Sequence, residues 1–266
     1  MYFSDDRSCR MIFDQVSESY LEARPEYPQE IYVDMHTMLF SGDSNSQLAH
    51  VLEIGSGSGQ ASEKLSNISK SLDCIEPGKN FIKLLNTKFK DNDAVKAHQC
   101  TFEEYQTDQK YDLIFSGCAL HWIPKETVLD KSEKLLNSDG WIVGVWNMPK
   151  FEPAIYELIE RIIHPLYPDF DIPRGTQEQI DYFDVGYEAL SNQKWVKYHQ
   201  KKIYYQNRSL NNELLLKLIW SYMDLSALGA ENVGLVYQQL DDEIQALGIE
   251  AHSVENCYPL AMAQKL

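Results

Sequence analysis

Cysteines are few and scattered in this chain of 266 residues. Their number is odd and none forms a Cys-x-x-Cys pair. This spacing argues against a disulfide framework or a zinc site and is typical of a reducing compartment. We therefore expect no metal centre. The five positions are Cys9, Cys74, Cys100, Cys118 and Cys257.

Targeting signals and long apolar runs are also missing. The opening ten residues, MYFSDDRSCR, lack the basic-then-apolar pattern of a signal peptide. No apolar run approaches the roughly 20 residues that span a bilayer. We therefore expect a cytoplasmic protein with no membrane partner.

Basic residues are scarce relative to acidic ones. Lys and Arg together number 24 against 40 Asp and Glu, which gives a formal net charge of -16. Such a surface repels phosphate backbones and anionic lipid, so nucleic acid is not an expected partner. The charge would tolerate a cationic ligand, but it is explained equally well by solubility alone. The composition does not indicate an oligomeric state.

Strands and helices alternate from residue 27 to residue 146. Short apolar runs predict strands, and apolar residues at helical spacing predict the helices between them. The expected helices cover 27–40, 59–70, 78–90 and 125–137, and the expected strands 50–55, 72–77, 94–100, 111–117 and 140–146.

This alternation indicates an α/β fold of the Rossmann-like, doubly wound kind. Runs such as DLIF and WIVGV suit parallel strands that are buried on both faces. We expect a mostly parallel sheet of seven strands with helices on both faces. Ligands bind such sheets beyond the carboxyl ends of the strands, where the strand order reverses.

The pattern changes after residue 150. Helices are predicted over 153–167, 211–225 and 231–248, and a polar strand over 194–206. The last ten residues predict a final strand, which Pro259 would confine to an edge or delay. We divide the chain into an N-terminal lead-in segment (1–45), a Rossmann-like core (46–150), and sheet-completing strands with a helical cover (151–266).

The segment VLEIGSGSGQ, residues 51–60, joins the first strand to its helix through three glycines. Glycine permits positive φ and lets a ligand approach the backbone, while the following helix start presents free N–H groups. A dinucleotide fingerprint would carry its third glycine where Gln60 stands. The Gly-x-Gly-x-Gly turn after Glu53 is a different signature.

The segment VLEIGSGSGQASEKL resembles the first motif of class I S-adenosylmethionine-dependent methyltransferases. Similar segments follow in the same order: CIEP, CTFEEY, YDLIFSGCALHWIP and LLNSDGWIVGVWN. The opening FDQVSESYLEARPEYP is similar to the lead-in of the subgroup that methylates trans-aconitate and related acids. The resemblance covers residues 13–147 and implies S-adenosylmethionine as the cofactor.

The resemblance also implies roles for individual residues. Glu76 stands 21 positions after Gly55, near the offset at which a carboxylate binds ribose hydroxyls. Glu53 would lie near the methionine amino group, and Arg24 would bind a carboxylate of the cofactor or acceptor. The expected cofactor-binding residues are Tyr20, Arg24, Glu53, Gly55, Gly57, Gly59, Glu76, Thr101, Phe102 and Ser116.

The acceptor side is less constrained. His121 is a candidate general base for a protic acceptor, although it could instead orient its loop. Arg24 could form a surface ion pair, and Phe102 and the aromatic residues could belong to the core. The aromatic candidates for the acceptor site are Trp122, Trp146, Trp220 and Tyr222.

The predicted reaction is in-line methyl transfer to a small molecule, with a carboxylate of an organic acid as one acceptor. Positioning can contribute on the order of 7–11 kcal/mol in such reactions. No metal is needed, and a carboxylate acceptor needs no base. Two alternatives stay open at this point: a nicotinamide-dependent dehydrogenase, and a nucleotide-fold binding or regulatory protein without turnover.

Overall fold

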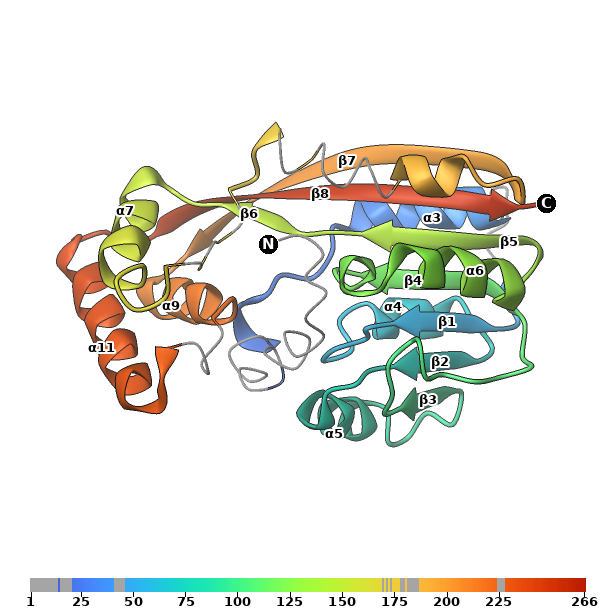
Figure 1. Ribbon diagram of the computed structural model, residues 1–266, viewed down its shortest axis with the longest axis horizontal. Helices are drawn as coiled ribbons and strands as arrows, with labels where there is room; N and C mark the ends of the chain where they lie inside the picture. Colours follow the sequence, from blue (N-terminus) through green and yellow to red (C-terminus); the bar gives the residue numbers. More distant parts are fainter. Residues whose placement is uncertain are drawn as a thin grey trace.

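The computed structural model describes residues 14, 21–40, 46–168, 170, 172, 174–177, 180, 187–223 and 228–266. Its centre is a sheet of parallel strands in the order β3-β2-β1-β4-β5 (Figure 1). The strand order reverses between β1 and β4, as predicted for a doubly wound sheet. The strands are β1 (Val51–Ile54), β2 (Leu72–Ile75), β3 (Val95–His98), β4 (Tyr111–Gly117) and β5 (Leu136–Val145).

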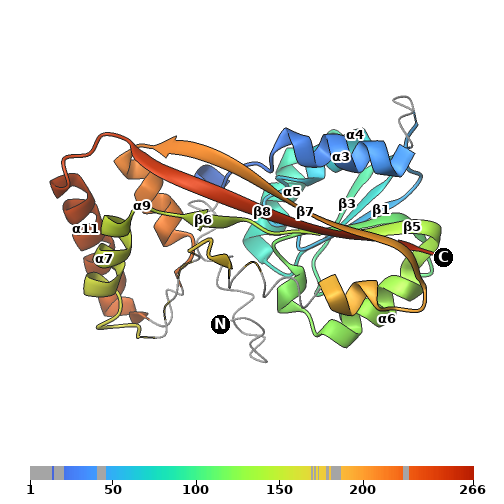
Figure 2. The ribbon, with the colours of Figure 1, turned by 90° about the horizontal axis from the view of Figure 1, so that it is seen from above.

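Helices cover both faces of this sheet (Figure 2). Alternate strand residues point to opposite faces, so Leu113 packs in one core cluster and Ile114 in another. The first cluster holds α3 (Gln29–Phe40), α4 (Ser62–Asn67) and α5 (Lys79–Lys88) against the sheet, and the second holds α6 (Lys125–Leu135). The predicted α/β class with helices on both faces is therefore confirmed.

The final strand, β8 (His252–Lys265), lies inside the sheet, so the prediction of an edge or delayed strand was wrong. It pairs antiparallel with β5 and β6 (Met148–Lys150) on one side and with β7 (Val196–Leu210) on the other. The carbonyl of Pro259 accepts from Trp146 N at 3.0 Å, so its nitrogen faces the gap between β5 and β6. The proline nitrogen therefore faces away from β7, and the missing N–H costs no bond between β7 and β8.

The long strands β7 and β8 form a two-stranded ribbon, which runs from the central sheet to a separate group of helices (Figure 1). These helices are α7 (Pro153–Ile162), α9 (Asn212–Trp220) and α11 (Ala230–Ala246). They enclose their own apolar core, which includes Ile159, Leu218 and Leu240. We call α7, α9 and α11 the distal helices.

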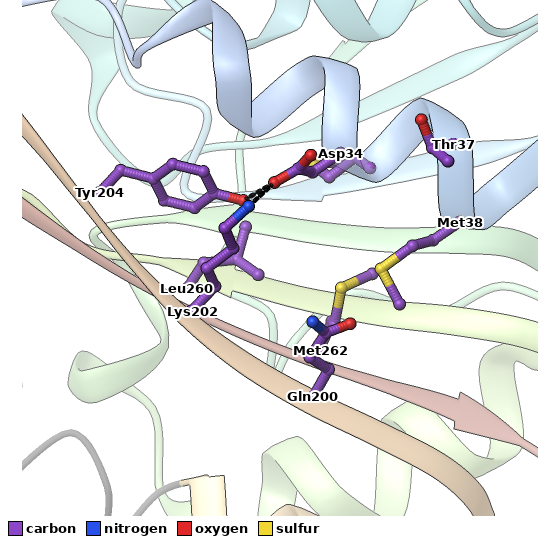
Figure 3. Close-up of a pocket in the computed structure, with 9 residues that line it drawn as sticks. Asp34, Thr37, Met38, Gln200, Lys202, Tyr204, Leu260 and Met262 are labelled. Carbon is purple, nitrogen blue, oxygen red and sulfur yellow. Dashed lines mark hydrogen bonds and ion pairs between the residues drawn. The ribbon is translucent and has the colours of Figure 1, made fainter.

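Helix α3 is bonded to the middle of β7 (Figure 3). Asp34 accepts a hydrogen bond from the Tyr204 hydroxyl at 2.7 Å and pairs with Lys202. The hydrogen bond from Lys202 lowers the pKa of Asp34. A cavity of about 180 Å³ lies beside this pair, lined in part by Met38 and Met262. It contains no residue of the glycine loop, so it is not the predicted cofactor site.

Candidate cofactor site

The glycine loop leaves β1 in a left-handed conformation. Gly55 has φ +68° and Gly57 has φ +53°, values that residues with a β-carbon rarely adopt. A β-carbon at Gly55 would come within 2.3 Å of Ala119 Cβ, whereas one at Gly57 would meet nothing within 4 Å. Gly57 is therefore the position where the loop backbone is open to a ligand.

Gly59 serves packing in this structure. A β-carbon there would lie 2.9 Å from Leu85 and 3.2 Å from Phe89, both from α5 or its end. Lys88 also donates to the Gly59 carbonyl at 2.8 Å. The three glycines that the sequence groups together therefore meet three different surroundings.

Glu76 lies at the mouth of the loop, at the end of β2, and is 7% exposed. Its two carboxylate oxygens each accept a backbone N–H, from Gly57 at 2.9 Å and from Gly78 at 2.7 Å. Burial raises the pKa of this carboxyl to about 7. Each oxygen keeps a further lone pair, so the group can still accept bonds from a diol.

Glu53 lies beneath the loop and is 2% exposed. Its carboxylate accepts hydrogen bonds from the Ser62 hydroxyl and, at 3.6 Å, from the Cys74 thiol. Burial raises the pKa of Glu53 to about 7. These contacts tie β1 to α4 and β2 and support the structural reading of Glu53 beside the cofactor role.

The lead-in segment runs across the carboxyl ends of the strands. Asp14 accepts from the backbone N–H of Asn80 at 2.8 Å and of Phe81 at 3.2 Å, and so caps α5. Gln60 donates to the carbonyl of Arg24 at 3.1 Å. The lead-in is therefore attached on both sides of the glycine loop. Tyr20 lies outside the described residues.

Arg24 connects the lead-in to the end of α9. Its Nε donates to the Ser221 hydroxyl at 2.9 Å, and Nη2 donates to the Ser221 carbonyl at 3.2 Å. The guanidinium also lies 3.5 Å from the centre of the Tyr222 ring. In this arrangement Arg24 and Tyr222 join two segments that are distant in the sequence.

The end of β4 lies beneath Tyr27. A β-carbon at Gly117 would come within 2.3 Å of the Tyr27 hydroxyl, so the ring packs directly on the backbone there. Cys118 follows with φ +56°, and its sulfur accepts from Asn147 N at 3.1 Å. The buried Ser116 hydroxyl donates to the Ile54 carbonyl at 3.0 Å, so its proton is used within the sheet.

The loop after β3 is held by a lysine. Lys131 donates to the carbonyls of Phe102 and Tyr105 and lies 4.9 Å from the Phe102 ring centre. Phe102 is 2% exposed and packs in the sheet core. Thr101 closes the turn through hydrogen bonds with Glu104 at 3.0 Å.

His121 is oriented by Trp146. The indole Nε1 donates to His121 Nδ1 at 3.1 Å, which assigns the imidazole proton to Nε2. Burial lowers the pKa of His121 to about 4, so the ring is neutral at physiological pH. The ring of Trp122 lies 4.9 Å from that of His121. The histidine thus has the contacts of a loop-orienting residue.

Trp220 does not lie with the other aromatic candidates. It is 7% exposed in the core of the distal helices, with its ring 4.9 Å from that of Tyr237. Packing in this core is sufficient to explain a tryptophan at this position, and no contact with a ligand is required.

Sequence reasoning missed several residues around the loop. Asp14, Tyr27 and Lys131 carry no spacing signal, because each contacts a segment that is remote in the chain. Ser58 was also missed. The Ser58 hydroxyl is buried and has no hydrogen-bond partner among the described residues. Its place inside the glycine loop was the one available signal.

Neither a metal cluster nor a membrane helix occurs in the described part of the chain. No three His, Cys, Asp or Glu side chains there lie close enough to hold a metal ion. None of the described helices is both long and apolar enough to cross a membrane.

Comparison with known proteins agrees with this geometry. Residues 52–142 match the family model of a methyltransferase domain. The chain contains a class I methyltransferase domain. S-adenosylmethionine is the cofactor of this class, and the matched range includes the glycine loop, Glu76, Thr101, Phe102 and Ser116.

Two curated relatives extend the likeness. A provisionally named methyltransferase of Dictyostelium discoideum is 30% identical over 186 residues, which cover 69% of this chain and 59% of the relative. The malonyl-[acyl-carrier protein] O-methyltransferase 2 of Ilyobacter polytropus is 27% identical over 136 residues, covering 48% and 52%. The chain thus spans little more than half the length of either relative.

A solved structure supports the fold. A provisionally assigned type II methyltransferase from Anaeromyxobacter dehalogenans superposes with a TM-score of 0.56 at 16% identity, covering 91% of this chain and 97% of that one. At this identity the likeness concerns the fold alone.

The residues present fit S-adenosylmethionine. Gly57 offers open backbone, Ser58 offers a buried hydroxyl with no partner in the described region, and Glu76 offers two oxygens to a diol. The Ser58 hydroxyl can donate to an anionic amino-acid tail, and Glu76 can accept from ribose hydroxyls. The N–H of Gly57 is already bonded to Glu76, so Gly57 contributes the open space through which a ligand approaches the loop.

Proposed function

We propose that this protein transfers the methyl group of S-adenosylmethionine to a small organic acid, on a carboxylate oxygen. The observation that carries the proposal is the open Gly57 backbone beside the buried Glu76 carboxylate. The bound cofactor supplies a methyl group already activated on sulfonium. The protein's own contribution is alignment and the exclusion of water.

Three regions would share this work, with the boundaries 1–45, 46–150 and 151–266. The core residues Gly57, Ser58 and Glu76 bind the cofactor, with Thr101 and Phe102 beside the adenine. The lead-in, attached through Gln60 and Asp14, closes the site from above. The region after residue 150 supplies the acceptor side.

A carboxylate acceptor is favoured by the state of His121. Its Nδ1 accepts the Trp146 indole proton and its pKa is near 4, so it is a poor base at neutral pH. A carboxylate is already an anion and needs no base. The O-methyltransferase name of the Ilyobacter relative and the lead-in likeness to the trans-aconitate subgroup support the same acceptor class.

The aromatic side chains near the end of β4 would bound the acceptor. Trp146 and Trp122 flank His121, and Tyr222 lies over Arg24. The free thiols of Cys74 and Cys118 support a reducing, cytoplasmic location. The dehydrogenase alternative is disfavoured by the methyltransferase domain match.

The test is calorimetric titration with S-adenosylhomocysteine, S-adenosylmethionine and NAD. We expect binding of the first two and none of NAD. Glu76→Gln loses one carboxylate oxygen as an acceptor and should weaken S-adenosylhomocysteine binding by roughly 10- to 150-fold, the value of a charged hydrogen bond. Glu63→Gln, at an exposed position on α4, is the matched control.

Two results would contradict the proposal. One is the absence of heat with either sulfur-containing ligand for folded wild-type protein. The other is an affinity for S-adenosylhomocysteine that is the same in Glu76→Gln and Glu63→Gln. Binding without transfer of labelled methyl to any acid would instead favour a regulatory protein.

A further inference from the structure

Polar side chains gather on one face of the ribbon, where it meets the lead-in. In the β7–β8 register, Arg208 pairs with Val254, Gln206 with Asn256 and Tyr204 with Tyr258. Alternate residues of a strand share a face, so Arg208, Gln206, Asn256 and Tyr258 lie on the same side. We call these four residues the ribbon cluster.

The lead-in packs on this cluster. Arg208 Nη1 donates to the carbonyl of Ala23 at 3.2 Å. The Tyr27 ring lies 6.2 Å from the Tyr258 ring and also covers Gly117 at the end of β4. The ribbon cluster therefore borders the same strand ends that carry the candidate cofactor site.

Arg208 is half-buried and pairs with no carboxylate among the described residues. Two other arginines do pair with carboxylates of the distal helices. Arg161 makes two hydrogen bonds of 2.9 Å to Glu243, and Arg174 forms an ion pair with Glu160 at 3.3 Å. Acidic residues outnumber basic ones in this chain by 40 to 24. An unmatched, partly desolvated guanidinium in such a chain still has most of its planar N–H donors to offer.

A second residue of the ribbon cluster, Asn256, has one polar atom without a partner among the described residues. Asn256 is fully buried, and its Nδ2 donates to Asn147 Oδ1 at 2.7 Å. Its own Oδ1 receives no hydrogen bond within the described part of the chain. Asn147 N in turn donates to the Cys118 sulfur, so these contacts connect the ribbon cluster to the end of β4.

We propose that Arg208 binds a carboxylate of the methyl acceptor and thereby selects acceptors that carry at least two acidic groups. A carboxylate held by a guanidinium fork has its oxygens engaged, so a different carboxylate must receive the methyl group. Arg208 is then a specificity-determining residue, remote from the methylated oxygen. This inference rests on the proposed function.

A carboxylate fits better than a phosphate. Arg24, the nearby second cation of the lead-in, is already bonded to Ser221 and stacked on Tyr222. One guanidinium matches the two oxygens of a carboxylate.

The experiment measures tritiated methyl transfer to aliphatic dicarboxylates and tricarboxylates and to their monoamides, with inorganic phosphate as a competitor. It uses the wild type, Arg208→Gln, Arg208→Lys and the control Arg161→Gln. We expect Arg208→Gln to raise KM for polycarboxylates by roughly 10- to 150-fold, with a smaller change in kcat. Arg208→Lys, which keeps the charge without the fork, should lie between, and Arg161→Gln should match the wild type.

S-adenosylhomocysteine binding is measured first on every variant. Failure of the proposed cofactor site is thereby distinguished from failure of the inference about Arg208. The polycarboxylates are then titrated by calorimetry with and without S-adenosylhomocysteine. The inference is overturned if no polycarboxylate binds or accepts methyl, if amides serve as well as acids, or if phosphate competes more strongly than any acid. It is also overturned if Arg208→Gln and Arg208→Lys change KM by less than about threefold.

Discussion

The central sheet and the ribbon bury their strands in different ways. The four residues of β1 are all buried, because helices cover both faces of the parallel strands. Strand β7 is 15 residues long and mostly exposed, with Tyr205 62% and Tyr198 45% exposed. β1 is buried along its whole length, whereas β7 is stabilised by its pairing with β8, by α3 and by the core of the distal helices.

One edge of β7 pairs with no strand of the described part of the chain, and it carries features that discourage pairing with another chain. Lys197, Lys201 and Lys202 lie along it, and charged side chains on an edge strand oppose aggregation. The central sheet therefore carries the candidate cofactor site, while the ribbon carries Arg208, the proposed acceptor-binding residue, and continues to a second core. The candidate site lies where the two regions meet.

The largest expected effect tests whether the two cores unfold separately. Leu218 lies in the distal core and Leu113 in the central sheet, and both are fully buried. Each Leu→Ala change should cost about 2–5 kcal/mol. In scanning calorimetry, we expect Leu218→Ala to lower the unfolding temperature of the distal helices and to retain S-adenosylhomocysteine binding. We expect Leu113→Ala to lower the unfolding temperature of the central sheet, which is the transition that S-adenosylhomocysteine stabilises.

A single transition that both variants shift equally would contradict this division. It would mean that the ribbon couples the two cores into one cooperative unit.

The next effect concerns the buried acid beneath the loop. Burial raises the pKa of Glu53 from 4.5 to about 7. The folded protein therefore retains a proton that the unfolded chain releases, and stability falls as the pH rises from about 4.5 to about 7. Glu53→Gln should remove this loss, with a relative gain of roughly 3 kcal/mol at most between pH 5 and pH 8.

Urea unfolding at both pH values measures this difference, with the exposed Glu63→Gln as control. A difference between Glu53→Gln and wild type that is the same at pH 5 and pH 8 would show that Glu53 is ionised throughout. Glu76, whose pKa is also near 7, keeps part of the slope in both proteins.

The smallest expected effect tests whether Lys131 positions the loop after β3. Lys131→Met removes hydrogen bonds to the carbonyls of Phe102 and Tyr105. Because the lysine only positions this loop, S-adenosylhomocysteine affinity should fall by a few-fold, about 1 kcal/mol. Lys134→Met, at an exposed position of the same helix, should leave the affinity unchanged. Equal affinities in the two variants would exclude the positioning role.

Prediction from sequence worked best where the signal is local. The predicted strand 111–117 matches β4 residue for residue, and the helices at 78–90 and 125–137 agree with α5 and α6 within two residues at each end. The predicted strand 194–206 ended too early, because β7 continues to Leu210 and so includes Arg208. Its last residues are set by pairing with β8, a partner more than 40 positions away.

The amino-acid sequence by itself determined the alternation of strands and helices, the glycine turn and the distance from Gly55 to Glu76, since periodicity, backbone freedom and offset are properties of neighbouring residues. Only the tertiary structure decided that Gly57 is open while Gly59 packs on α5, and that the nitrogen of Pro259 faces away from β7. It also decided that Arg208 pairs with no carboxylate among the described residues. These outcomes depend on register and contact between segments that are far apart in the chain, and no local pattern encodes them.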